Sequence, residues 1–318
     1  TLKMAPVRIT AKDNSTAWKK QRAGTASEPS TLGFPHYIVG AYDPQVAKFD
    51  AVIQTVPYET GLSPSPWEII TDFQILKQAG VYDVELCRSL SLFDAQFNMN
   101  NKILARAMMS HAEKAGTLSD SQFGSRKGLS AIMVATGKTL NYDIIRQKRV
   151  SATHVGLDAA QCYDRMAHPP TALCMIKHGA PPTAFCSMFA VLQNSEHNVT
   201  TAFGVSTATY GGKHREVRGE LPNQGSGQGS GSGPGGWAVE STEIVGVMED
   251  ENHAAEMWAP ISFILLMILC WLFVDDADLS QVAKSLQSPG EDQVARIQEA
   301  IDCWIGTLKA TGGTVNLH

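Results

Sequence analysis

The stretch FVDDADL, from Phe273 to Leu279, places two adjacent carboxylates directly after an apolar segment. Like charges this close are costly unless a cation or solvent compensates them. Successive side chains in a tight hairpin point to opposite faces, so we expect one of Asp275 and Asp276 to be the principal ligand of a bound ion. An exposed acidic turn or a helix cap explains the pair equally well when the stretch is taken alone.

A second acidic motif, LDAAQCYDRM, runs from Leu157 to Met166. A strand that ends in Asp158 would present a carboxylate at the edge of a sheet, where Mg²⁺ is bound through one or two carboxylates and substrate phosphates. Alone, an Asp at a strand end more often caps the following helix. If the strands ending at Asp158 and Asp275 are neighbours in one sheet, their carboxylates converge on a site that can hold two ions about 3.5 to 4 Å apart. Such a pair of ions stabilises the attacking and leaving oxygens in phosphoryl transfer.

Residues 211–236 are rich in glycine and polar side chains and include LPNQGSGQGSGSGPGG. This composition is typical of a flexible linker and therefore marks a possible domain boundary. Within it, Gln228 to Pro234 (QGSGSGP) has a second interpretation. Small residues let a backbone approach a base pair or a phosphate closely.

Charge is distributed unevenly along the chain. The 318 residues are 43% hydrophobic, enough for one large core or two modest ones, and the net charge is -5. From Glu85 to Val150, ten Lys and Arg face five acids, so this segment is +5 and the remainder is -10. A basic region beside an acidic one suits a protein that holds phosphates in one place and metals in another. Solvated helix faces explain the charge as well.

The six cysteines are scattered without a CxxC pair, and no secretory signal stands at the beginning of the sequence. This pattern is typical of a reduced intracellular chain, so we expect a protein of the nucleus or cytoplasm that is not secreted. A strongly apolar stretch without charges, Trp258 to Val274, has seventeen residues. A bilayer span needs about 20, and a buried helix or strand leading into a turn explains the stretch at least as well, so we expect no stable membrane association.

Periodicity predicts the main elements. Residues 1–30 are polar and predict a tail. The expected helices are Trp67–Ala79, Asn100–Ala115, Ser130–Gln147 and Val294–Ala310, and the expected strands are His154–Asp158 and Asn198–Phe203.

In order and spacing, these motifs resemble the conserved blocks of reverse transcriptases. They are most similar to the retroelement type found in unicellular eukaryotes, which carries a QGxGxGP block and an FVDD block. The resemblance covers Leu32 to the end of the sequence, and six blocks in order are a specific signal. The further blocks are RSLSL at 88–92, the helix with Lys102 and Arg106, QFGSRKG at 122–128 and WIGTLKATGG at 304–313. Ser89 replaces the usual proline of the first.

The resemblance implies a role for each matching residue. Asp158, Asp275 and Asp276 are implied as catalytic residues and metal ligands, with Asp158 and Asp275 as the bridging pair and Asp276 in support. Tyr163 matches the aromatic residue that excludes a ribose 2′-hydroxyl. The remaining implied residues bind nucleotide (Arg88, Gln228 and Gly229) or nucleic acid (Lys102, Arg106, Arg126 and Lys127).

The same resemblance implies an α+β fold of the right-hand polymerase type. Fingers would occupy 31–150 and a palm 151–318, the palm being an antiparallel sheet backed by helices, and we expect the thumb to be missing. The implied cofactors are two Mg²⁺ ions, with Mn²⁺ as a possible substitute. The implied partners are an RNA template, a DNA or RNA primer and dNTPs; the oligomeric state stays open.

Two other functions remain open at this point. An RNA-dependent RNA polymerase also has a palm and paired aspartates. Enzymes of that class are similar to one another in carrying a polar residue at the sugar-selecting position, whereas this chain has Tyr163. A degenerate palm retained as a binding or membrane-associated module is suggested by the apolar stretch and the missing thumb. Comparing the incorporation of dNTP and rNTP distinguishes an RNA-dependent RNA polymerase from a reverse transcriptase. A primer-extension assay distinguishes the degenerate palm from an active enzyme.

Overall fold

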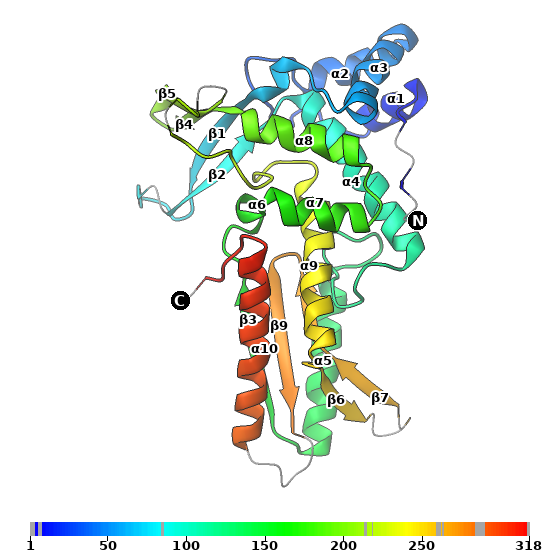
Figure 1. Cartoon of the computed structure of the whole chain (residues 1–318), viewed down its shortest axis with the longest axis vertical. Helices are drawn as coiled ribbons and strands as arrows, with labels where there is room; N and C mark the ends of the chain where they lie inside the picture. Colours follow the sequence, from blue (N-terminus) through cyan, green and yellow to red (C-terminus); the bar gives the residue numbers. More distant parts are fainter. Residues whose placement is uncertain are drawn as a thin grey trace. The chain divides into compact units, whose positions relative to one another are not determined.

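The computed structural model shows an α+β protein that divides into two compact units (Figure 1). It describes residues 4–5, 8–83, 86–212, 215–217, 219–258, 262, 264–283 and 290–316. Unit 1 comprises 1–112 and 175–233, and unit 2 comprises 113–174 and 234–318. Both units are built from two separate stretches of sequence, so this division differs from the expected one of 31–150 and 151–318.

Unit 1 contains a four-stranded sheet in the order β2-β1-β4-β5. The strands β1 and β4 are parallel, and the outer pairs are antiparallel. Its strands are β1 (Ile69–Leu76), β2 (Cys87–Leu92), β4 (Glu196–Thr201) and β5 (Gly204–Gly211). Its helices are α1 (Ala11–Lys19), α2 (Phe34–Gly40), α3 (Pro44–Thr60), η1 (Ser65–Glu68), α4 (Ala95–Ala115, which ends in unit 2) and α8 (Pro182–Asn194).

The expected polar tail is wrong where the structure describes it. Residues 11–19 form α1, which begins with a capping box between Thr10 and Asp13. Trp18 is buried in the core of unit 1, stacks on Tyr37 with ring centroids 4.6 Å apart, and donates from Nε1 to Asp50 Oδ2 at 2.7 Å. This short helix buries only one large apolar side chain, Trp18, so its sequence shows no helical repeat of apolar residues.

The expected helix at Trp67–Ala79 is also wrong, because most of it forms β1. This strand is central, pairing with β2 on one side and β4 on the other. Short apolar runs fit the helical and the strand period about equally, and two neighbouring strands satisfy the backbone of this one on both sides. The expected strand at Asn198–Phe203 is confirmed by β4, with bounds shifted by two residues.

A buried polar network joins all four strands of this sheet. Asp72 accepts hydrogen bonds from Ser91 at 2.7 Å and Tyr210 at 2.5 Å, and it lies 2.7 Å from His197 Nδ1, whose Nε2 lies 2.9 Å from Ser195 Oγ. Burial would raise the pKa of Asp72, but the hydrogen bonds from His197, Tyr210 and Ser91 outweigh it and hold the pKa below its ordinary value. Ser195 is fully buried and cannot meet a substrate, so the network is structural.

Unit 2 contains an antiparallel sheet in the order β3-β9-β8 and a separate antiparallel pair, β6-β7. Its strands are β3 (Ala152–Asp158), β6 (Ala255–Trp258), β7 (Leu265–Ile268), β8 (Cys270–Phe273) and β9 (Asp276–Val282). Its helices are α5 (Ala131–Lys148), α6 (Cys162–Arg165), α7 (His168–Lys177, which ends in unit 1), α9 (Gly233–Asp250) and α10 (Gly290–Ala310). The helices predicted at Asn100–Ala115, Ser130–Gln147 and Val294–Ala310 and the strand at His154–Asp158 are confirmed.

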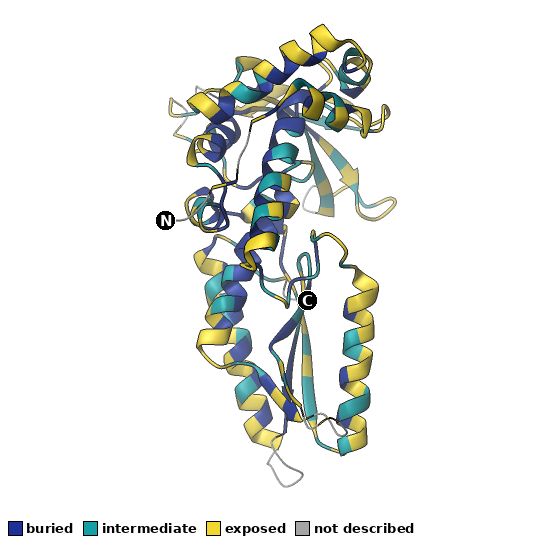
Figure 2. Cartoon of the chain, turned by 90° about the vertical axis from the view of Figure 1, so that its right-hand side faces the viewer, coloured by how far each residue is buried: buried dark blue, intermediate teal, exposed yellow. Residues whose placement is uncertain are grey.

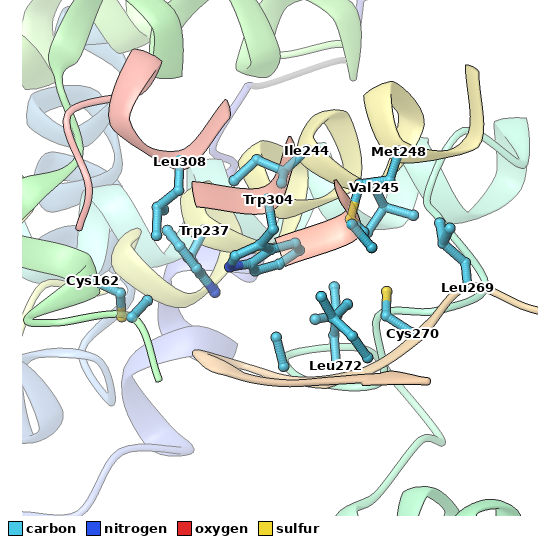
Figure 3. Close-up of a cluster of buried hydrophobic side chains, with 14 of the residues drawn as sticks. Cys162, Trp237, Ile244, Val245, Met248, Leu269, Cys270, Leu272, Trp304 and Leu308 are labelled. Atoms are coloured by element: carbon cyan, nitrogen blue, oxygen red, sulfur yellow. The ribbon is translucent and has the colours of Figure 1, made fainter. Parts of the chain in front are cut away.

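Helices back the three-stranded sheet of unit 2. One stripe of α10 packs on β3 and β9 and its other side is exposed, as Figure 2 shows. The core between α9, α10 and the sheet includes Trp237, Trp304, Ile244 and Leu272 (Figure 3). The opposite face of the sheet carries α5, where Lys138 Nζ donates to Asp278 Oδ2 at 2.6 Å.

The apolar stretch Trp258–Val274 forms parts of β6, β7 and β8, apart from residues 259–261 and 263, which lie outside the described residues. The sequence interpretation of a strand leading into a turn is therefore confirmed for β8. In the part of the chain that the structure describes, no helix is long and apolar enough to cross a membrane.

The glycine-rich segment does not behave as a linker near its end. Ser91 N–H donates to the Gln228 carbonyl at 2.8 Å, and the Asn98 side chain donates to the Gly229 carbonyl at 2.9 Å. A Cβ on Gly229 would lie 2.4 Å from the Ser91 carbonyl oxygen, and its φ is +128°. The glycines therefore permit a close backbone approach, as expected, but the partner is the protein's own β2 and α4. One division between the two units falls between Gly233 and Pro234, inside this segment.

Candidate active site

The acidic motifs meet at one end of the unit 2 sheet. Phe273 pairs with Asp276 across β8 and β9, which leaves Val274 and Asp275 as a two-residue turn. Asp276 also pairs with Asp158 across β9 and β3. The two motifs therefore share one sheet, which meets the condition set out for a shared site, but the immediate neighbour of β3 is the strand that begins at Asp276.

This register sets two carboxylates against each other. Directly paired residues of an antiparallel ladder project from the same face with Cβ atoms about 4.5 to 5.5 Å apart. Asp158 and Asp276 are such a pair, and both are exposed. Like charges in this position destabilise a sheet, and a divalent cation would remove the repulsion. The register favours Asp276 as the partner of Asp158, whereas the resemblance favours Asp275, so their ranking stays a prediction.

Asp275 lies in the turn, close to α6. Its backbone carbonyl accepts from Ala159 N–H at 3.4 Å, which extends the β3–β9 ladder by one bond. Burial raises the pKa of the Cys162 thiol to about 12, and the Asp275 carboxylate contributes to the increase. Burial also raises the pKa of Tyr163, again with a contribution from Asp275. The charge of Asp275 therefore acts on both Cys162 and Tyr163 within unit 2.

Oxygen donors of this kind match Mg²⁺, which prefers carboxylates. Among the residues that the structure describes, however, no three Asp, Glu, His or Cys side chains form a group that could hold a metal ion. The two-metal site therefore stays a prediction that rests on the donor chemistry and the register.

A cavity of about 370 Å³ opens beside Asp276, between α5 and the start of β9. Its walls include Phe273, Lys138 and Tyr142, and the ion pair of Lys138 with Asp278 forms part of its rim. The space next to the acidic end of the sheet is thus accessible and carries both polar and apolar walls.

A scan against protein-family models finds no model that matches this chain, and a search of the curated proteins finds no match. The role of the hairpin is therefore inferred from its own residues.

The other predicted site residues are divided between the units. Unit 1 carries Arg88 on β2, Gln228 and Gly229 in the glycine-rich segment, and Lys102 and Arg106 on α4. Arg88 and Arg106 are exposed. Lys102 is half-buried and donates to Gln21 Oε1 at 2.8 Å, and burial, followed by the charge of Arg106, lowers its pKa. Arg88 and Arg106 are therefore better placed than Lys102 to meet phosphates.

Arg126 and Lys127 lie in the segment before α5, within unit 2. The Arg126 guanidinium binds both Glu113 carboxylate oxygens, at 2.8 and 2.9 Å, and donates to the Ser119 carbonyl at 2.7 Å. Most of its donors are thus used inside the protein, and it braces this segment. Lys127 is exposed and is the better candidate of the two for a phosphate contact.

Sequence reasoning missed three residues that surround the acidic hairpin. Asn316 donates from Nδ2 to Asp158 Oδ2 at 2.5 Å. Gln122 and Trp237 bind the backbone of Val274. Gln122 stands in the quoted QFGSRKG block and so had a signal, whereas nothing in the sequence marks Trp237 or Asn316.

A further missed residue is Glu240, a buried carboxyl on α9. It accepts from Thr171 Oγ1 at 2.6 Å. Burial raises its pKa from 4.5 to about 7, against the hydrogen bonds from Thr171 and Thr311, which lower it. The folded state therefore favours the protonated form, which makes the stability of unit 2 sensitive to pH.

We expect Glu240→Gln to stabilise unit 2 above pH 7. The pKa of Glu240 is raised in the folded state. The contribution of its protonated carboxyl to the free energy of unfolding is therefore fully present below pH 4.5 and is lost as pH rises towards 7. Gln keeps the neutral shape at every pH, so its advantage grows over that window to about 3 kcal/mol, at 1.36 kcal/mol per pKa unit. Chemical denaturation between pH 5 and 9 measures it. Glu249→Gln, at an exposed position of the same helix, is the control; equal pH profiles for the two variants would contradict the prediction.

Proposed function

We propose that this chain is the fingers-and-palm part of an RNA-directed DNA polymerase, which adds dNTPs to the 3′-hydroxyl of a DNA or RNA primer on an RNA template. The observation that carries the proposal is the register of Asp158 against Asp276 at the end of an antiparallel hairpin, with Asp275 in the turn. The order of the further blocks along the chain supports it. Unit 1 would be the fingers and unit 2 the palm.

Each residue has a defined task in this proposal. Asp158, Asp275 and Asp276 would hold two Mg²⁺ ions, which on binding supply charge neutralisation for the attacking and leaving oxygens. Arg88 would neutralise triphosphate charge through charge-assisted hydrogen bonds, and Gln228 and Gly229 would lie against the template and the incoming nucleotide. The nucleic-acid phosphates would be contacted by Lys102, Arg106, Arg126 and Lys127. The exposed Arg106 and Lys127 would make the main contacts.

Tyr163 would set the choice of sugar. An aromatic ring beneath the sugar leaves no room for a 2′-hydroxyl, so the site accepts dNTP and rejects rNTP. The ring is half-buried on α6, and the charge of Asp275 adds to the effect of burial in raising the Tyr163 pKa, which supports this role. The same residue argues against an RNA-dependent RNA polymerase.

We expect Tyr163→Val to raise rNTP incorporation relative to dNTP by about 10- to 100-fold, because the smaller side chain opens the space for the hydroxyl. Primer extension on an RNA template with each nucleotide measures the ratio. Tyr163→Phe is the matched control, since it keeps the ring, and its ratio should stay near that of the unchanged chain. An unchanged ratio in Tyr163→Val would remove the sugar-selecting role.

A second candidate is a palm that binds nucleic acid without catalysing. The observation that favours it is that the described residues contain no three-residue group arranged to hold a metal. Extension by the chain with Mg²⁺ or Mn²⁺ would reject it, whereas primer-template binding without extension would support it.

A further inference from the structure

The turn between β8 and β9 has an unusual backbone. Val274 has a φ of +62°, in the left-handed region. A β-branched side chain in this region is a genuine outlier, and such a backbone conformation is strained. It persists only where the surroundings hold it in place. The peptide that Val274 shares with Asp275 therefore needs partners.

Two buried side chains bind this peptide unit and its neighbour. Trp237 Nε1 donates to the Val274 carbonyl at 2.6 Å, and Gln122 Nε2 donates to the same oxygen at 3.3 Å. Gln122 Oε1 accepts from Val274 N–H at 3.3 Å and from Gly124 N–H at 2.7 Å. The amide of Gln122 thus bridges the 121–124 segment and the turn.

The segment that carries Gln122 is itself fixed to the hairpin. Its backbone pairs with Leu272 on β8, because Phe123 N–H donates to the Leu272 carbonyl and Leu272 N–H donates to the Ser121 carbonyl, both at 2.9 Å. Gln122 Nε2 also donates to Ser241 Oγ on α9 at 2.9 Å. Gln122 and Trp237 are 1% and 2% exposed, so water does not compete for these bonds.

Burial in the core does not by itself give an indole a partner. Trp304 lies in the same cluster as Trp237 and is equally buried (Figure 3). Within the described residues, its Nε1 has no hydrogen-bond partner. The bond from Trp237 to the turn is therefore specific to its position, and Trp304 provides a matched comparison.

We infer that Trp237 and Gln122 are positioning residues that hold the Val274 turn in its left-handed conformation and thereby orient Asp275 and Asp276 for a divalent cation. The inference deepens the proposed function and rests on it for its catalytic consequence. Trp237 and Gln122 do not touch substrate or ion in this role. They act on the carboxylates indirectly, by fixing the peptide unit between Val274 and Asp275.

Trp237→Phe tests the inference, because it keeps an aromatic side chain, though a smaller one, and removes the N–H donor; Trp304→Phe loses the same volume without losing a hydrogen bond. Trp304→Phe is the matched control. We expect Trp237→Phe to weaken Mn²⁺ binding, followed by electron paramagnetic resonance of the free ion, by about tenfold, as loss of one buried hydrogen bond predicts. It should raise the Mg²⁺ concentration for half-maximal primer extension by a similar factor, and Trp304→Phe should change both by less than about twofold.

The outcomes separate the inference from the proposed function. Equal metal affinity in the two tryptophan variants overturns the inference, whether or not the chain extends primers. Failure of the unchanged chain to extend any primer, together with weakened Mn²⁺ binding in Trp237→Phe alone, overturns the proposed function and keeps the positioning role. If Trp237→Phe does not fold, Gln122→Met replaces it in the same comparison, with circular dichroism as the check of folding.

Discussion

Asp275→Asn should abolish primer extension while leaving primer-template binding largely intact. The substitution keeps the shape of the side chain and removes the charge that the proposed ions require. Metal-ion stabilisation of the transition state is worth several kcal/mol, so we expect the rate to fall by about 10³-fold. Single-turnover extension measures the rate, and fluorescence anisotropy of a labelled primer-template measures binding.

Two further variants make this test specific. Asp278→Asn, also on β9, removes a carboxylate that is paired with Lys138, and it should change the extension rate by only a few-fold because such a pair contributes about 1 kcal/mol or less. Asp276→Asn decides which of the adjacent acids is the main ligand. A larger loss of extension rate than in Asp275→Asn would favour Asp276, the residue paired with Asp158 in the sheet. Retained extension in Asp275→Asn would remove the turn from the catalytic site.

Gly124→Ala should also reduce extension strongly, for a steric reason. A Cβ on Gly124 would lie 2.3 Å from Val274 N and 2.8 Å from Val274 Cγ2. Because the first of these atoms is backbone, the turn itself has to move, and a displacement of about 1 Å at a reacting centre costs about 10²-fold in rate. Extension kinetics and the unfolding midpoint should be measured together.

The control for this variant is Gly246→Ala on α9, where nothing lies within 4 Å of the added Cβ. Alanine there should stabilise the helix by about 1 kcal/mol without changing extension. If Gly124→Ala extends primers at the rate of Gly246→Ala, the contact between the 121–124 segment and the hairpin has no functional weight.

The long helices could be predicted from the sequence because their signals are local. Residues 100–115 repeat apolar side chains at helical spacing and end at Gly116, which has a φ of +64°, as a helix C-terminus favours. The strand ending at Asp158 and the turn after Phe273 had local signals as well. Their neighbourhood in one sheet was a condition that their own residues left open, and only the resemblance to reverse transcriptases implied it.

The errors and omissions have non-local causes. β1 looked helical because its partners, β2 and β4, are set by tertiary pairing rather than by its own short apolar pattern. The hydrogen bonds from Gln122 and Trp237 to Val274 were missed because Val274 lies 152 and 37 positions away from these residues. A hydrogen bond to a backbone carbonyl leaves no pattern in side-chain types, so no spacing rule could have found it.

The chain passes between the two units at residues 112–113, 174–175 and 233–234. This interleaving has a consequence for synthesis on the ribosome. Strand β1 is made early but cannot gain its parallel neighbour β4 until about 120 further residues have emerged, which takes about 6 to 24 s at typical elongation rates. During that interval β1 can pair with β2, but its other edge has no partner, and such an edge can pair with another chain. The acidic hairpin is made later still, so Asp275 and Asp276 emerge only after unit 1 can close.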